Sequence, residues 1–303
     1  MRLVDSYPVY VLCGPTGVGK SQLAIELADK YKGEVVSADS RQVYIGMDIG
    51  TAKVPAEARK VRHHLLDIVR PQESFSAQDF RMRALEVLKE LKLKGRKAFV
   101  VGGTGLYLKA LTQGLFTGSG RVAGIRENLE KKSAAELYRE LKRVDPQKAG
   151  KLSLSDRQRV VRALEVFYAE GKPMSAIEKK RRAPAGFKFI WAGLKLDREK
   201  LYRRIEERID SQLKIGWVEE VVRLKRDGFC SEWPAFKTIG YPEIYRFLRG
   251  ELTEAQMAQT IKQKTRNYAK RQMTWFRHQS PVKWFEADNP QIVRELEPYW
   301  GLN

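Results

Sequence analysis

Short apolar runs alternate with helical repeats over the first hundred residues of the chain. Residues 19–31 place apolar side chains on one face of a helix that stops near Gly33, and Ser76 with Asp79 forms a capping box that opens a long helix. Three runs have the length and composition of buried strands: VYVLC (9–13), EVVSA (34–38) and KAFVV (97–101). This alternation predicts a parallel sheet with helices on both faces.

The pattern changes after a glycine-rich stretch, GLFTGSGRVAG, at 114–124. Residues 122–180 carry only helix signals, including SLSDRQRVVRALEVFYAEGKP, where we expect a serine cap at the start and Gly171 at the end. Strand character returns in FKFIWAGL (187–194), and several helices are expected from there to the end. We therefore predict a core of residues 1–117 and 183–303, interrupted by a helical insertion domain of residues 118–182.

The first strand runs directly into a glycine-rich turn that precedes a helix. This turn, Gly14, Pro15, Thr16, Gly17, Val18, Gly19, Lys20 and Ser21, matches the pattern G-x4-G-K-S in full. Backbone N–H groups and a helix N-terminus would bind a di- or triphosphate there, Lys20 would add a charge, and the Ser21 hydroxyl would hold Mg²⁺. The core is thus predicted to be a P-loop NTPase-like α/β fold, although the loop does not say whose phosphates it holds.

Two other strands end in polar residues that this loop should meet. EVVSA leads into Asp39, and KAFVV leads into a turn with Thr104. Ligands of open parallel sheets bind beyond the carboxyl ends of the strands, so we expect these side chains and the loop to converge. Asp39 is then a candidate base, the alternative being a turn or cap residue. The stretch FVVGG lacks the carboxylate that ATP-splitting enzymes place there, which favours gripping a phosphate leaving group.

Charge adds a second kind of ligand. The chain has 57 Lys and Arg against 37 Asp and Glu, a net charge of +20, which favours a polyanionic partner such as nucleic acid. Residues 255–285 contain no acid and interleave their cations with Tyr268, Trp275 and Phe276. We interpret this segment as an RNA or DNA contact, and a solvated basic face is the alternative.

The remaining composition excludes several classes of protein. No apolar run reaches the roughly 20 residues that span a bilayer, and the N-terminus lacks the layout of a secretory signal. Cys13 and Cys230 give neither a disulfide framework nor metal-ligand spacing. We expect a cytoplasmic protein that does not contact membranes and acts as a monomer.

The main helix of the insertion begins with a polar cluster, Gln158, Arg159 and Arg162. Gln158 and Arg162 lie one turn apart and share a face, whereas Val160 and Val161 belong to the packed side. Guanidinium groups bind phosphate through paired hydrogen bonds, so the cluster is a candidate clamp for RNA. Surface ion pairs are the alternative.

Taken in order, these motifs resemble those of bacterial tRNA dimethylallyltransferases, also called tRNA isopentenyltransferases. The resemblance spans nearly the whole chain and rests on GPTGVGKS, SADSRQVYIGMDIGTAK, LLDI, FSAQDFR, VGGTGLY, DRQRVVRALEVF and AKRQMTWFR. It implies transfer of a dimethylallyl group from dimethylallyl diphosphate to N6 of adenosine 37, beside the anticodon, in tRNAs that read codons starting with U. The anticodon stem-loop would then be the nucleic acid partner.

The resemblance also implies roles for individual residues. Thr16 to Ser21 would bind the donor diphosphate with Mg²⁺, Asp39 would be the general base, and Thr104 would help to orient the substrates. Its tRNA-contacting positions correspond to Asp39, Ser40, Arg41, Gln42, Thr104, Arg126, Gln158, Arg159, Val160, Val161, Arg162, Lys237, Thr238, Ile239, Gly240 and Tyr241. Pro242 stands where a basic residue is more usual in the family, which puts a phosphate contact there in doubt.

Two other functions fit the same residues. A P-loop kinase would bind ATP and use Asp39 to deprotonate an acceptor hydroxyl, but it leaves the acid-free C-terminal segment unexplained. An RNA-binding module could use the phosphate loop only as a switch, without chemistry of its own. Phosphate transfer without RNA would identify the first, and RNA binding without turnover the second.

Overall fold

The computed structural model describes residues 6–115, 123–178, 183–278 and 282–302. The chain divides into two compact units, one formed by residues 1–111 and 185–303 and the other by residues 112–184. The domain boundaries predicted from the sequence, at 117–118 and 182–183, fall on or beside residues outside the described ranges. Each unit is described by itself.

A parallel sheet of six strands forms the centre of the first unit. Its strands are β1 (Tyr7–Cys13), β2 (Gly33–Ser37), β3 (His63–His64), β4 (Lys97–Gly102), β5 (Phe187–Lys195) and β6 (Lys283–Glu286), and their order in the sheet is β3-β2-β4-β1-β5-β6. The four strands expected from apolar runs are present. The helices expected after residue 194 are also present, but the sequence did not predict β6, which pairs with β5. Edge strands as short as β3 and β6 carry too few residues to show a period.

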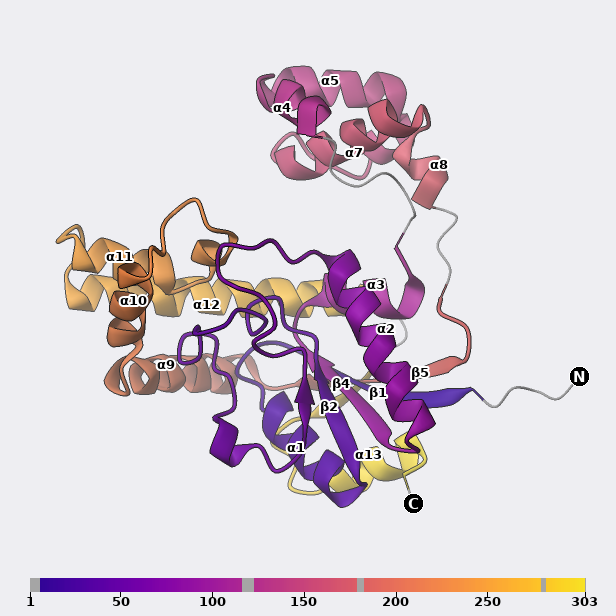
Figure 1. The fold of residues 1–303 in the computed structure, drawn as a ribbon, viewed down its shortest axis with the longest axis vertical. Helices are drawn as coiled ribbons and strands as arrows, with labels where there is room; N and C mark the ends of the chain where they lie inside the picture. The colour runs from indigo at the N-terminus through magenta and orange to yellow at the C-terminus, as the bar shows by residue number, and fades with distance from the viewer. Residues whose placement is uncertain (1–5, 116–122, 179–182, 279–281, 303) are drawn as a thin grey trace, which may run out of the picture. The chain divides into compact units, whose positions relative to one another are not determined.

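Alternating side chains of the sheet belong to two separate apolar cores. Tyr10 and Leu12 of β1 pack with α1 (Lys20–Lys30) on one face, and Val9 and Val11 pack on the other with α2 (Ala77–Leu93) and α3 (Gly105–Gln113). Figure 1 shows α1 and α2 on opposite sides of the strands. The first face is completed by α9 (Arg198–Lys214), α10 (Trp217–Arg226), α11 (Tyr241–Leu248), α12 (Glu254–Arg277) and α13 (Ile292–Trp300). Burial on both faces explains why the strands read as continuous apolar runs.

Helix α2 begins where the sequence predicted. The Ser76 hydroxyl accepts the Asp79 N–H, and the Asp79 carboxylate accepts the Ser76 N–H at 2.8 Å. This capping box satisfies two N–H groups that the first helical turn leaves without intrahelical partners.

The second unit is a small bundle of helices. It contains α4 (Ala123–Glu130), α5 (Ala134–Val144), α6 (Pro146–Ala149), α7 (Arg157–Glu170) and α8 (Met174–Glu178), around a core with Leu137, Leu141 and Leu164. Helix α7 ends at Gly171, as expected, but the prediction of a serine at its N-cap was wrong. Asp156 occupies the N-cap position without a side-chain cap bond, since its carboxylate accepts the N–H of Ser153 at 3.1 Å. Residues 116–122, most of the glycine-rich stretch at 114–124, lie outside the described residues.

The ends of β2, β4 and β1 lie side by side because these strands are neighbours in the sheet. The approach of β4 to β2 is close: a Cβ on Gly102 would lie 2.1 Å from the carbonyl oxygen of Ala38. Only glycine fits there without displacing the turn that carries Asp39. In the part of the chain that the structure describes, no helix is both long and apolar enough to cross a membrane.

Candidate active site

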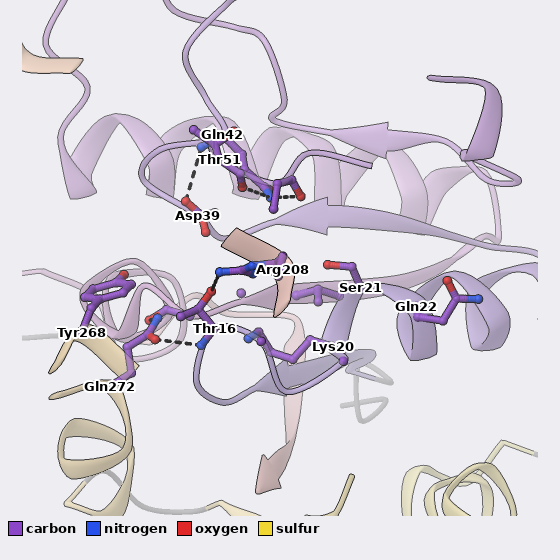
Figure 2. Close-up of a pocket in the computed structure, with 16 residues that line it drawn as sticks. Thr16, Lys20, Ser21, Gln22, Asp39, Gln42, Thr51, Arg208, Tyr268 and Gln272 are labelled. Carbon is purple, nitrogen blue, oxygen red and sulfur yellow. Dashed lines mark hydrogen bonds between the residues drawn. The ribbon is translucent and has the colours of Figure 1, made fainter. Parts of the chain in front are cut away.

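A cavity of about 310 Å³ opens at the carboxyl edge of the sheet (Figure 2). Its lining comes from the turns after β1, β2 and β4, the end of β4, the first turn of α1, the loop after Asp48, and helices α9 and α12. The lining residues are Thr16, Gly17, Gly19, Lys20, Ser21, Gln22, Asp39, Gln42, Thr51, Ala52, Val101, Gly102, Gly103, Arg208, Tyr268 and Gln272. The structure thus brings Asp39 and the glycine-rich loop to one cavity.

The loop between β1 and α1 leaves the helix N-terminus open to this cavity. Gly19 is the N-cap residue of α1, with φ of 102° and no side-chain cap. A left-handed φ suits glycine, and the missing cap leaves N–H groups of the first turn available to an anion. Gly14, Pro15 and Val18 are buried behind the lining residues of the loop. This geometry is that of a phosphate site.

Lys20 supplies the first cation of the cavity. Its amine donates a hydrogen bond to the carbonyl oxygen of Pro15 at 2.6 Å, which holds it against the loop. Burial lowers the pKa of Lys20 to about 8, and the negative charge of Asp39 opposes that shift. The ammonium is therefore poorly solvated and would gain more from an anionic ligand than an exposed lysine would.

Arg208 of α9 supplies a second cation that sequence reasoning missed. Its Nη2 donates to the Thr16 hydroxyl at 3.0 Å, whereas its buried Nε has no hydrogen-bond partner among the described residues. Burial lowers its pKa, and the charge of Asp39 opposes the shift. Figure 2 shows the guanidinium between Asp39 and Thr16. Nothing in the local sequence separates Arg208 from the exposed Arg203 and Arg204 of the same helix, because only the fold places it in the cavity.

Asp39 is held in a fixed orientation by its own turn. Its Oδ1 accepts the N–H of Arg41 at 2.7 Å and the N–H of Gln42 at 3.3 Å. Asp39 is therefore both the turn residue and the cavity residue that the sequence left as alternatives. Because both bonds within the described chain go to Oδ1, Oδ2 is left to accept a proton from a ligand.

Helix α12 forms a wall of the cavity through two side chains. Gln272 accepts the N–H of Thr16 at 2.9 Å and donates to the carbonyl oxygen of Gly103 at 2.9 Å, so it ties the phosphate loop to the turn after β4. Burial, together with the charge of Asp39, raises the pKa of Tyr268 to about 12. The sequence had assigned Tyr268 to a nucleic acid surface and had given Gln272 no role.

Thr104 lies just behind the cavity and does not line it. Its hydroxyl accepts the N–H of Ser40 at 3.0 Å, so it fixes the turn that begins with Asp39. Gln42 lines the cavity, with its amide donating to the carbonyl oxygens of Thr51 and Ala52. In this arrangement Thr104 and Gln42 shape the site through the chain around them.

The basic segment of residues 255–285 is more structural than its charge suggested. Three cations of α12 pair with acids of neighbouring helices: Lys262 with Asp210, Lys264 with Glu243, and Arg266 with Glu206. Acids of α9 and α11 therefore balance three of the cations in this acid-free segment. The interpretation of the segment as an RNA or DNA contact remains a prediction, and these three cations have a structural role as well.

The predicted tRNA contacts of residues 237–241 are mostly buried. Lys237 is exposed, but Thr238 is 5% exposed and Tyr241 is fully buried. A Cβ on Gly240 would lie 1.9 Å from the Trp217 ring. Thr238 and Tyr241 therefore present no side chain to RNA in this conformation, and contacts of Lys237, the half-buried Ile239 and the Gly240 backbone remain predictions.

In the helical unit the predicted contacts divide in the same way. Val160 and Val161 are 1% and 2% exposed, so they pack its core and do not present side chains to RNA. Arg126 and Arg162 both pair with Glu165, whose side chain is fully buried. Gln158 is exposed, and the Arg159 side chain is 71% exposed. These latter two are the accessible part of the predicted clamp.

The cavity also fits a magnesium ion bound mainly by its ligand. Among the described residues no group of three or more His, Cys, Asp or Glu could hold a metal. The Ser21 hydroxyl and the Asp39 carboxylate both line the cavity, and Mg²⁺ commonly takes one or two such protein oxygens together with phosphate and water. This donor set suits an ion that arrives with a diphosphate.

Comparison with known proteins places the chain in a family. A family model described as IPP transferase matches residues 42–279. A tRNA dimethylallyltransferase of Geobacter metallireducens is 46% identical over 292 residues, which cover 94% of each protein. One of Anoxybacillus flavithermus is 41% identical over 286 residues, which cover 94% of this chain and 92% of the relative.

Solved structures agree with these relatives. The full-length tRNA isopentenylpyrophosphate transferase of Bacillus halodurans has a TM-score of 0.72 and 36% identity, covering 97% of this chain and 94% of that one. A eukaryotic dimethylallyltransferase, described as acting on tRNA, has a TM-score of 0.81 and 28% identity, and the match covers 96% of this chain and 76% of that one. The fold, the phosphate loop and these matches lead to one conclusion: this chain belongs to the tRNA dimethylallyltransferase family of IPP transferases.

Proposed function

We propose that this protein transfers a dimethylallyl group from dimethylallyl diphosphate to the N6 amine of an adenosine beside the anticodon of tRNA. One observation carries the proposal: a phosphate loop, two partly buried cations and a single fixed carboxylate line the same cavity. The cations suit a departing diphosphate, and the carboxylate suits an acceptor that must lose a proton. The family relationship supplies the identity of the two substrates.

The donor half of the site is the glycine-rich loop with Lys20 and Arg208. The N–H groups at the start of α1 would bind diphosphate oxygens, and the two cations would neutralise the charge that grows as the carbon–oxygen bond breaks. Mg²⁺, held by the Ser21 hydroxyl and by the diphosphate itself, would supply further positive charge to the leaving group. Gln272 keeps the loop in place by accepting the N–H of Thr16.

The acceptor half is Asp39. A purine amine is a poor nucleophile, so the allylic carbon must gain cationic character before attack. The N6 lone pair then forms the carbon–nitrogen bond, the diphosphate leaves with the electrons of the broken bond, and Asp39 takes the proton from nitrogen. A stacked adenosine cannot reach this cavity, so we infer that the base flips out of the anticodon loop, at a cost of a few kcal/mol.

The proposal is tested by direct transfer of a label. The protein is incubated with Mg²⁺, unmodified tRNA that reads a codon starting with U, and dimethylallyl diphosphate labelled in the allyl group. Label on adenosine, with equal release of diphosphate, is the expected result. Transfer of phosphate from ATP in the absence of RNA, or no transfer to any such tRNA, would reject the proposal.

The pH dependence of donor binding provides a prediction about Lys20. The amine is charged below its pKa of about 8, so affinity for a diphosphate should fall as the pH rises through that value. We expect the Kd of dimethylallyl diphosphate, titrated without tRNA, to rise roughly tenfold between pH 7 and pH 9. Lys20→Met should bind more weakly and lack this rise, and an equal rise in the variant would assign the titration to another group.

A second prediction concerns the exposed arginine of the helical unit. Arg159→Gln should weaken tRNA binding and reduce the slope of log K against log salt by roughly 0.7–0.9, because one phosphate contact is lost. Arg162 is a poorer probe, since its removal leaves the buried Glu165 without that partner. Arg139→Gln, an exposed change on α5, is the control. Equal salt slopes for wild type and Arg159→Gln would remove Arg159 from the contact.

A further inference from the structure

Glu220 of α10 is a buried carboxylate for which the reaction itself has no use. Glu220 is only 1% exposed, and no Lys or Arg forms an ion pair with it among the described residues. Four neutral donors satisfy it instead: the N–H groups of Asp48 and Ile49 at 2.7 Å, the N–H of Gly50 at 3.2 Å, and the Tyr241 hydroxyl at 2.7 Å. A carboxylate bound in this way fixes the backbone that surrounds it.

The backbone held by Glu220 leads directly to the cavity. Thr51 and Ala52 follow the three bound residues and line the cavity wall. Their carbonyl oxygens accept hydrogen bonds from the Gln42 amide at 3.1 and 3.2 Å. The N–H of Gln42 in turn donates to Asp39 Oδ1. A continuous chain of bonds therefore runs from Glu220 to the carboxylate that faces the acceptor.

The other side of this loop is held by a second buried charge. The Lys53 amine donates to the carbonyl oxygen of Tyr44 at 2.6 Å and to Asp48 Oδ1 at 2.8 Å, and it also bonds to Asp67. Its side chain is 2% exposed. Asp48 is thus bound through its N–H by Glu220 and through its side chain by Lys53. We call these contacts of Glu220 and Lys53 with residues 48–50 and Asp67 the brace. Its loop residues belong to the motifs GMDIGTAK and LLDI, to which the sequence analysis assigned no chemical role.

We propose that Glu220 is a positioning residue for prenyl transfer. Its carboxylate holds residues 48–50 and, through Thr51, Ala52 and Gln42, sets the position of Asp39 relative to the flipped adenosine. This inference rests on the proposed function. A displacement of about 1 Å at a reacting group can cost roughly a hundredfold in rate, so loss of the brace should act on turnover more than on donor binding.

The test compares Glu220→Gln with a second change that loosens the same brace. Gly50→Ala keeps Glu220, but its Cβ would lie 2.1 Å from the Trp217 ring nitrogen and 2.6 Å from the Tyr241 hydroxyl. Glu34→Gln is the matched control, because Glu34 is also a buried carboxylate. It is hydrogen-bonded to His64 and lies near the start of β2, at the end of the strand away from Asp39. Amide hydrogen exchange and steady-state kinetics are measured on each protein well below its unfolding temperature.

We expect Glu220→Gln and Gly50→Ala to exchange faster at residues 39–42 and 48–52 and to lose about 10- to 100-fold in kcat. The Kd of inorganic pyrophosphate should change by less than about threefold, and Glu34→Gln should keep the wild-type kcat. Wild-type kcat in folded Glu220→Gln, unchanged exchange at 39–42, or an equal loss in Glu34→Gln would overturn the inference. If Glu220→Gln does not fold, Gly50→Ala decides alone. Failure of the wild-type protein to transfer at all would instead reject the proposed function.

Discussion

Asp39→Asn should lower the rate of prenyl transfer by about 10²- to 10⁴-fold, the usual contribution of a general base. Asparagine keeps an oxygen that can accept the N–H groups of Arg41 and Gln42, so the turn should be retained. What it loses is the capacity to take the proton from N6. Substrate binding should therefore change little, and the loss should fall on kcat.

The measurement is single-turnover transfer with saturating donor and tRNA, together with separate Kd values for each substrate. Thr51→Ser, a conservative change in the same cavity, is a suitable comparison for general disturbance of the wall. A variant Asp39→Asn that transfers at more than about a tenth of the wild-type rate would show that another group, or water, accepts the proton.

Arg208→Ala should have the second largest effect, with kcat reduced by about 10²- to 10³-fold, the range seen when one charge-stabilising donor is removed. The guanidinium is already desolvated and bound to Thr16, so it needs little reorganisation as charge develops on the diphosphate. Its removal also leaves the Thr16 hydroxyl without this donor. Dimethylallyl diphosphate should bind more weakly, while tRNA affinity should stay within about threefold.

Arg204→Ala is the matched control for this change. It removes an exposed arginine from the same helix and should leave both kcat and donor binding unchanged. Transfer kinetics and donor titrations of the two variants are compared at equal salt. If Arg208→Ala weakens tRNA binding and leaves donor binding intact, the guanidinium belongs to the acceptor side and the division proposed for the cavity is wrong.

The elements that the sequence predicted are those whose signals are local. Buried strands such as β1 and β4 appear as continuous apolar runs because both faces of the sheet are covered. The capping box at Ser76 is a contact between residues three apart, so its pattern is visible in the sequence. Strand β6 is four residues long and depends on its pairing with β5, which no local period reveals.

The candidate site shows the same division between local and tertiary information. The phosphate loop and Asp39 follow strands and could be named from the sequence. Arg208 and Gln272 reach the cavity from helices about 190 and 260 residues away from Thr16 along the chain, and only packing brings them there. Helical spacing gives such residues the same appearance as any polar surface position.

Charge was the least direct guide. The cations of an acid-free segment can still be balanced by acids from elsewhere in the chain, and the partners of Lys262, Lys264 and Arg266 lie on other helices. Val160 and Val161 likewise belong to a motif segment but face the core. A contiguous motif on a helix contains residues of every face, and the structure decides which of them can touch RNA.

We propose that the phosphate loop binds the diphosphate of the donor while Asp39 faces the N6 amine of the acceptor adenosine. The most direct measurement is the distance between the Asp39 carboxylate and adenine N6 in a complex of this protein with Mg²⁺, pyrophosphate and an unmodified anticodon stem-loop. We expect roughly 2.6–3.2 Å, or one bridging water, with pyrophosphate on the loop beside Lys20 and Arg208. An adenine bound elsewhere, or pyrophosphate away from the loop, would contradict it.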